Sequence, residues 1–361
     1  MSRGTTAIIN LAHLKHNYTV LKKQAPNKLV LVIKADAYGH GIKRVIQTLG
    51  TVDCYAVATI EEALLIRRYN QEVKILLLEG FLDANELETA FENNFDCVIH
   101  QIEQIKLLQT IASSKTMNIW CKLDSGMNRL GFNTEQFQSA IKILEKHPNV
   151  QDIILMSHFA SADDNTNTLT QKQTEMFLQI DKAYPTYQQS LSNTSALLNH
   201  KNLKDEWCRV GLALFGVSPI ANKQAQDFGL KPVMTLKTNI IAIKNIGVNQ
   251  GIGYSHAYVS TKPMKIAIIG IGYGDGYPWN LTDKASVKVN GIPAQIVGRV
   301  SMDMLAIDVS TIKNLKVGDS VLVWGQDKKS ELPLETVASH AQTIPYVLLC
   351  QITSRVHYNY V

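Results

Sequence analysis

The stretch Leu29–Gly41, LVLVIKADAYGHG, decides the fold of the first part of the chain. It opens with five aliphatic residues, a run typical of a strand buried on both faces. Lys34 follows at once, then an aspartate, a tyrosine and two glycines. Such a lysine either reaches solvent with its amine or is partly desolvated, with a lowered pKa that makes it a nucleophile able to form a Schiff base. The ends of the other strands decide between these readings.

Apolar runs of strand length continue from this stretch to about Gly216, and segments with helical periodicity separate them. The expected strands are 29–35, 54–59, 74–80, 96–100, 118–124, 152–159, 189–195 and 209–216, and examples of the helices are 61–69, 101–112, 134–146 and 171–184. Eight strands alternating with helices predict an α/β fold, a TIM-like (β/α)8 barrel, with a doubly wound open sheet as the main competitor.

The helical periodicity of the sequence fades after residue 230. Short β-like segments at 235–246, 265–276, 285–301, 304–310 and 319–325 are divided by Gly, Asn, Asp and Pro, which predicts a mostly antiparallel β domain. Asn290-Gly291 predicts a hairpin turn, and one helix is expected around 334–342. We therefore expect a barrel over 1–230 and a β domain over 231–361, with about the first ten residues as a candidate strand of the β domain.

Composition excludes several classes of protein. The 361 residues carry a net charge of only +5 without a dense basic run, so nucleic-acid binding is not expected. The five cysteines are scattered and show no metal-site spacing, which indicates reduced thiols and no metal. No segment reaches membrane-spanning length and no signal peptide is visible, so we expect a cytoplasmic protein without a membrane partner.

Polar residues end several of the expected barrel strands, where barrels place their chemistry. They include Lys122, Asp124 and Arg129 after the fifth strand, His158 after the sixth, Asn193, Thr194 and Ser195 after the seventh, and Arg209 and Gly211 at the eighth. Gathered in one pocket, their donors suit a phosphorylated, electron-withdrawing cofactor. This favours the nucleophilic reading of Lys34.

The sequence resembles the alanine racemases. VIKADAYGHG (32–41) is similar to the pyridoxal-phosphate signature of that family, and further family-like segments follow in family order across both expected domains. These are KLDSGMNRLGF (122–132), SHFASAD (157–163), LSNTSAL (191–197), CRVGLALFG (208–216), GIGYSHAY (251–258), IGYGDGYP (271–278) and GRVSMDMLAIDV (298–309).

The resemblance implies a two-base racemisation of L- and D-alanine. Lys34 would hold pyridoxal 5'-phosphate as a Schiff base and serve one face of the substrate. Tyr254, from the partner subunit of a homodimer, would serve the other face. A phenol with a usual pKa near ~10 needs help to lose its proton. The family's answer implies a chain of Tyr254, His158 and Arg209, with Arg209 also donating to the pyridine nitrogen.

The remaining roles also follow from the resemblance. Arg129 would contact the cofactor's phenolic oxygen and the substrate carboxylate, helped by Met302 and Asp303 of the partner chain. Lys122 is a candidate for carbamylation, and a salt bridge to Asp124 is its structural alternative. The phosphate would be held by Tyr38, Thr194, Gly211, Leu212 and Tyr273.

Two positions depart from the family pattern, and three other functions compete. Ser354 stands where some members carry a tyrosine near the phosphate, and His357 where a proline is frequent. The competing functions are a racemase of broader or serine specificity, a related decarboxylase, and a cofactor carrier. A carrier is typically a barrel alone, so the second domain with Tyr254 argues against it. The product D-alanine would supply peptidoglycan.

Overall fold

The computed structural model describes residues 3–111, 114–200, 202–203, 205–282 and 284–361. Its described residues form two compact units, one of Asn17–Leu214 with Pro219–Lys223 and the other of Met1–His16, Phe215–Ser218 and Gln224–Val361. We expected a boundary near residue 230, with about the first ten residues joining the β domain. In the structure, the unit of the β domain takes in the N-terminal segment as far as His16 and also Phe215–Ser218. Residue 112, the last of one expected helix, lies outside the described residues.

The first unit contains the eight expected strands, and all of their ladders are parallel. They are β2 (Lys28–Val32), β3 (Cys54–Val57), β4 (Ile75–Leu77), β5 (Asp96–Ile99), β6 (Met117–Lys122), β7 (Val150–Met156), β8 (Gln188–Ser190) and β9 (Trp207–Val210). β9 pairs with β2 and closes on the β8 side through the Arg209 N–H donated to Ser192 O at 2.9 Å. The predicted barrel is confirmed, and the open sheet is excluded.

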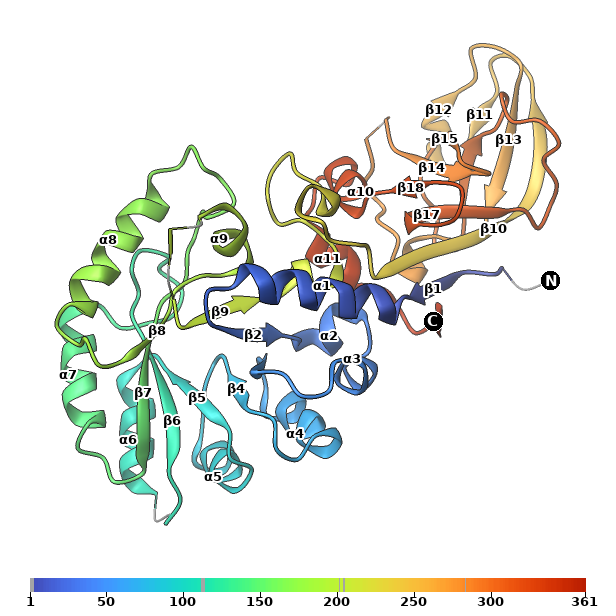
Figure 1. Cartoon of the computed structure of the whole chain (residues 1–361). Coiled ribbons are helices and arrows are strands. Elements are labelled where there is room, and N and C mark those ends of the chain that lie inside the picture. Colours follow the sequence, from blue (N-terminus) through green and yellow to red (C-terminus); the bar gives the residue numbers. More distant parts are fainter. Residues whose placement is uncertain (1–2, 112–113, 201, 204, 283) are drawn as a thin grey trace. The chain divides into compact units, whose positions relative to one another are not determined.

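Helices cover the outside of this barrel (Figure 1). They are α3 (Ile42–Leu49), α4 (Ile60–Tyr69), α5 (Ala84–Glu92), α6 (Ile102–Thr110), α7 (Thr134–Leu144), α8 (Leu169–Asp181) and the short α9 (Thr194–Asn199), while α1 (Leu11–Gln24) precedes β2. Thr59 and Asn133 cap α4 and α7 in capping boxes, which fixes where these helices begin.

Inward-facing residues of the strands fill the barrel. Val30, Ala56, Leu76, Val98 and Trp120 belong to one buried cluster contributed by five different strands. Four of the five cysteines are buried thiols as expected, whereas Cys350 is exposed. Because side chains fill the interior, chemistry is confined to the strand ends.

The second unit is mostly antiparallel, as predicted. Its nine-stranded sheet has the order β18-β17-β14-β15-β16-β13-β10-β1-β19, and a separate ribbon pairs β11 with β12. The strands are β1 (Thr6–Ile9), β10 (Met234–Ile246), β11 (Gly251–Ile252), β12 (Tyr258–Val259), β13 (Met264–Ile269), β14 (Ser286–Val289), β15 (Ile292–Val297), β16 (Leu305–Asp308), β17 (Ser320–Gln326), β18 (Glu331–Leu332) and β19 (His357–Tyr360), with helices α10 (Leu334–His340) and α11 (Pro345–Cys350).

Two local features of this unit follow from sequence. Asn290 and Gly291 both have positive φ, 52° and 84°, and join β14 to β15 in a tight hairpin. His357 opens β19, and its N–H donates to Thr5 O at 3.3 Å. A proline at position 357, frequent in the family, has no N–H for this bond.

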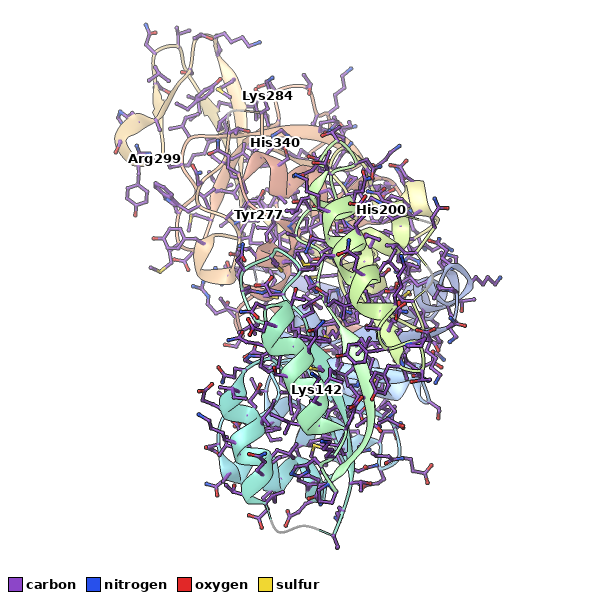
Figure 2. The ribbon with its side chains drawn as sticks, turned by 90° about the vertical axis from the view of Figure 1, so that its left-hand side faces the viewer. Lys142, His200, Tyr277, Lys284, Arg299 and His340 are labelled. Carbon is purple, nitrogen blue, oxygen red and sulfur yellow. The ribbon has the colours of Figure 1, made fainter. Side chains whose placement is uncertain are left out.

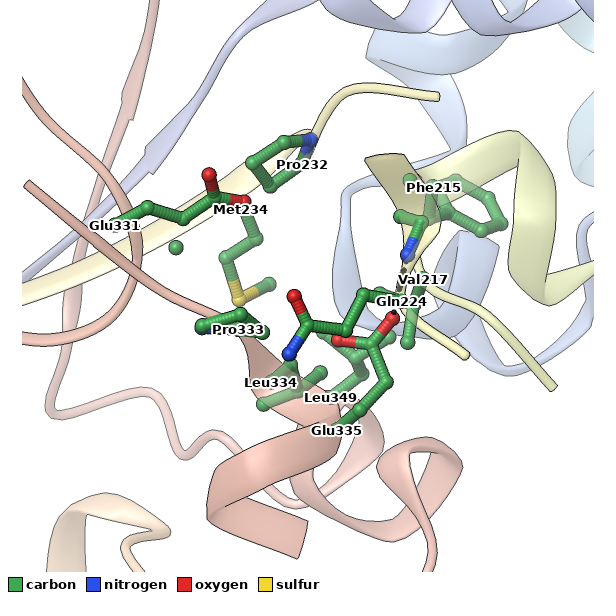
Figure 3. Close-up of a pocket in the computed structure, with 13 residues that line it drawn as sticks. Phe215, Val217, Gln224, Pro232, Met234, Glu331, Pro333, Leu334, Glu335 and Leu349 are labelled. Carbon is green, nitrogen blue, oxygen red and sulfur yellow. Dashed lines mark hydrogen bonds between the residues drawn. The ribbon is translucent and has the colours of Figure 1, made fainter. Parts of the chain in front are cut away.

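A small cavity lies where α10 meets the segment before β10 (Figure 3). Its volume is about 20 Å³, the size of one water molecule. Glu335 accepts the backbone N–H groups of Ser218 and Ala225 at 2.7 and 3.1 Å, and burial raises the pKa of its carboxyl group. The cavity is too small for a substrate, and its hydrogen bonds are structural.

Candidate active site

Lys34 is held by an unusual backbone turn. β2 ends at Val32, and α2 (Lys34–Gly39) is a left-handed turn in which Ala35 to Tyr38 all have φ between 49° and 56°. Each non-glycine residue in this conformation costs roughly 1–2 kcal/mol. Glu62 offsets part of this cost by accepting the Ala35 N–H at 2.6 Å. The turn leaves Lys34 half-buried at the carboxyl end of β2.

The buried Arg209 and the half-buried His158 form a pair at the ends of β9 and β7. Arg209 Nη2 lies 3.1 Å from His158 Nδ1, and the guanidinium also donates to Ser190 O and Ser157 O at 2.9 and 2.7 Å. Burial lowers the pKa of Arg209 to about 10, so it stays charged at neutral pH. Burial, and then the charge of Arg209, hold the pKa of His158 well below its usual range.

The protonation of His158 follows from this geometry. A neutral imidazole carries one proton, and its unprotonated nitrogen accepts hydrogen bonds. Because a guanidinium can only donate, Nδ1 of His158 is the acceptor and Nε2 carries the proton. His158 therefore offers an N–H donor on the side of its ring away from Arg209.

Lys122 is buried at the end of β6, with 6% of its surface exposed. Burial, followed by the charges of Arg209 and Arg129, lowers the pKa of its amine to about 8. Asp124 does not pair with it among the ion pairs of the described residues. Instead one carboxylate oxygen of Asp124 accepts the backbone N–H groups of residues 126, 127 and 128 and shapes the loop that carries Arg129. The salt-bridge alternative for Lys122 is thus unsupported.

Tyr38, Thr194 and Gly211 come together from three strand ends. A Cβ atom at Gly211 would lie only 2.7 Å from the Tyr38 hydroxyl oxygen, so this close approach requires glycine. The Gly211 N–H donates to Thr194 Oγ1 at 3.0 Å. That bond leaves the Thr194 hydroxyl proton to donate elsewhere. Leu212, also expected here, begins a buried 3-10 turn, Leu212–Phe215.

The other predicted residues belong to the β unit. The N–H groups of Tyr273 and Gly274 donate to Ser301 O and Met302 O at 3.1 and 2.9 Å, so the loop of Tyr273 lies against the loop that carries Met302 and Asp303. Tyr254 opens a separate 3-10 turn, Tyr254–His256, and is 68% exposed.

The loops of the β unit are held by charged residues that sequence reasoning missed. Arg3 and Arg355 both pair with the buried Asp275 at 3.0 and 3.2 Å and also with Asp303. Arg299, which is labelled in Figure 2, donates to the hydroxyl oxygen of Ser255, the neighbour of Tyr254, at 3.4 Å. The aspartate in GYGDG and the arginine in TSRV were the available signals. In the barrel, Glu62, Ser157 and Ser190 were missed in the same way.

The chain matches two family models that together span nearly all of it. Residues 9–219 match the alanine racemase N-terminal domain and residues 233–360 the alanine racemase C-terminal domain. The chain belongs to the alanine racemase family. It is 41% identical over 360 residues to an alanine racemase of Vibrio vulnificus, covering 99% of both chains, and 40% identical to one of Vibrio cholerae over 99% and 98%.

Solved structures of the family show the same fold. The biosynthetic alanine racemase of Pseudomonas aeruginosa superposes with a TM-score of 0.95 at 37% identity, covering 99% of both chains. The alanine racemase of Acinetobacter baumannii gives 0.94 at 36% identity, over 99% of this chain and 100% of that one. The resemblance read from the motifs is therefore confirmed. In the part of the chain that the structure describes, no helix is long and apolar enough to cross a membrane.

Proposed function

We propose that this protein interconverts L- and D-alanine with pyridoxal 5'-phosphate and two bases, Lys34 and Tyr254. Membership of the alanine racemase family supports the reaction. The observation that carries the mechanism is the Arg209–His158 pair, in which a permanent donor holds a neutral histidine with its remaining N–H on the side away from Arg209. A protein that only carries the cofactor does not need to transfer protons, so this pair favours an enzyme over a carrier.

The barrel residues fit the cofactor. Lys34 would hold it covalently through Nζ at the end of β2. The hydroxyl groups of Tyr38 and Thr194 suit a phosphate, with Gly211 as the residue that lets them approach each other. Leu212 and Tyr273 complete the proposed phosphate contacts. When bound, pyridoxal phosphate supplies a ring that accepts electron density from the substrate Cα as its proton leaves.

Arg209 would set the electronic character of that ring. A guanidinium donates and cannot be deprotonated at working pH, so a ring nitrogen facing Arg209 accepts a hydrogen bond without taking a full proton. The ring then withdraws less charge, which disfavours protonation at any carbon other than the substrate Cα. Charge control by Arg209 thus favours racemisation over transamination.

Tyr254 and Lys34 would move protons on opposite faces of the substrate. The Nε2–H of neutral His158 would donate to the phenolic oxygen of the partner's Tyr254, and such a bond would stabilise the phenolate that takes the Cα proton. Lys34 Nζ returns a proton from the other face, and in the reverse direction the two exchange roles. Microscopic reversibility requires both groups in both directions.

We further propose a homodimer whose subunits share their active sites. Large side chains that a finished site would cover are exposed in the single chain, namely Tyr254 at 68%, Met302 at 52% and Tyr273 at 42%. Contributing them to a partner's barrel would bury them and deliver the second base. Met302 and Asp303 would then help Arg129 to bind the substrate carboxylate.

Family membership also suggests roles for the two domains and for the product. The barrel over 1–230 would bind the cofactor, and the β domain over 231–361 would supply the second base. The D-alanine formed would serve peptidoglycan, and the cytoplasm is the expected location. A narrow pocket, with Tyr273 at its entrance, would favour alanine over a larger amino acid, although each methylene contributes only modest discrimination.

Replacement of Tyr254 by phenylalanine tests the proposal. Tyr254→Phe should retain cofactor binding and lose most racemisation, because it removes only the phenolic oxygen. Tyr258→Phe, on the adjacent strand β12, is the matched control and should remain active. Equal activity of Tyr254→Phe and the control would contradict the two-base mechanism.

A further inference from the structure

A basic cavity on the β unit has no part in the proposed reaction. Its volume is about 410 Å³, within the range of small-molecule pockets. Its lining includes Lys237 of β10, Lys288 of β14, Asn290 of the β14–β15 hairpin, and Asp327, Lys328 and Lys329 of the turn before β18. Four lysines therefore face one carboxylate.

The sheet register places two of these lysines over a shared floor. Lys237 of β10 and Lys288 of β14 are both paired with Leu322 of β17, one from each side. Residues directly paired across strands lie on the same face, so the two lysines stand about 10 Å apart at their Cα atoms with the buried Leu322 between them. Their long side chains can converge on a ligand resting on that face.

The single carboxylate of the cavity is already engaged. Asp327 pairs with Lys237 at 2.9 Å, and its other oxygen accepts the N–H groups of Lys329 and Ser330 at 2.9 and 3.0 Å. Among the ion pairs of the described residues, none involves Lys288, Lys328 or Lys329. The cavity is thus lined by three lysines that form no ion pair among those of the described residues.

Neutral donors accompany the lysines. The Asn290 side-chain oxygen accepts from Lys329 Nζ at 3.1 Å, which leaves its amide N–H groups to donate. The tight hairpin at Asn290-Gly291 fixes the backbone that carries this amide. A cavity with several cations and amide donors, and no unengaged carboxylate, matches a small ligand with adjacent negative charges.

We propose that this lysine cavity, defined by Lys237, Lys288, Lys328 and Lys329, binds a small molecule that carries a diphosphate group. The concave shape and limited volume favour a small anion over an extended polymer, which would need a basic track across the surface. The inference is independent of the racemase proposal, because the cavity shares no residue with the proposed catalytic set.

The test is calorimetric titration of inorganic diphosphate into the cofactor-loaded protein. Lys288→Ala with Lys328→Ala should weaken binding about tenfold or more, since each lysine contributes a charge-assisted contact. The matched control is the double variant Lys262→Ala with Lys313→Ala, which removes the same charge from exposed positions of the same unit outside the cavity. This control should bind diphosphate as tightly as the unchanged protein does.

Three results would overturn the proposal. The first is the absence of saturable binding below about 1 mM diphosphate. The second is equal weakening of binding in both double variants, which would indicate general charge attraction. The third is loss of binding in Thr194→Ala but not in the lysine double variant, which would place the diphosphate at the cofactor phosphate site. Thermal unfolding of both double variants checks that each remains folded.

Discussion

Lys122 is predicted to take up carbon dioxide as a carbamate when bicarbonate is present at about pH 8 and above. Only the neutral amine reacts with CO2. With a pKa of about 8, about half of the Lys122 amines are neutral at pH 8, whereas a lysine at the ordinary value of 10.5 is about 0.3% neutral. Burial and its cationic neighbours thus raise the reactive fraction by about two orders of magnitude.

The pH dependence of this reaction has a definite sign. Because the pKa of Lys122 is lowered, its neutral fraction rises as pH increases through about 8 and falls about tenfold per unit below about pH 7. The product is an anion, so Arg209 and Arg129, which disfavour the ammonium form, attract the carbamate. The same charges therefore promote the reaction and stabilise its product.

Carbon-13 NMR of the protein in labelled bicarbonate checks this prediction. A carbamate resonance should grow from about pH 7 to about pH 9. It should be absent from Lys122→Ala and unchanged in Lys142→Ala, which alters an exposed lysine on α7 (Figure 2). A resonance that persists in Lys122→Ala, or none in the unchanged protein at about pH 8.5, would refute the reasoning.

Three further predictions concern the pocket and its margin. Gly211→Ala places a Cβ atom 2.7 Å from the Tyr38 hydroxyl, so cofactor affinity should fall about tenfold or more in a spectral titration; unchanged affinity would show that the close approach is dispensable. Arg209→Lys keeps the charge but removes the planar guanidinium group that reaches His158, so urea unfolding should show that the free energy of unfolding falls by roughly 2–4 kcal/mol. A decrease below about 0.5 kcal/mol would contradict the stabilising role of this hydrogen-bond network. Ser354→Tyr introduces the aromatic residue that is common in the family and should raise turnover or cofactor affinity. If neither changes, the exposed Ser354 impairs neither turnover nor cofactor binding.

Much of the barrel was predictable because its strands are short apolar runs between amphipathic helices. The left-handed turn after Lys34 was not, because Ala35 to Tyr38 contains no glycine and local preference opposes positive φ. It is stabilised by contacts between residues distant in sequence, such as that of Glu62 with Ala35, together with local bonds such as that from the Ile42 N–H to the Asp36 carboxylate. The pattern also gave no sign of α11.

Some features of the candidate site were also predictable from the sequence, and others were not. Arg209 and His158 were predicted to act together, and they lie 3.1 Å apart. The hydrogen bond from the Gly211 N–H to Thr194 Oγ1 was not predicted, because it joins two strand ends that lie 17 residues apart in sequence. The phosphate-binding role of both residues stays a prediction. The role of Tyr254 was taken from a motif and stays a prediction.

The most direct measurement follows the optical rotation of L-alanine with the cofactor-loaded protein while total alanine is quantified. The proposed function predicts decay of the rotation to zero with total alanine unchanged, and the same end point starting from D-alanine. A rotation that stays constant while the cofactor is bound, or a fall in total alanine, would contradict racemisation.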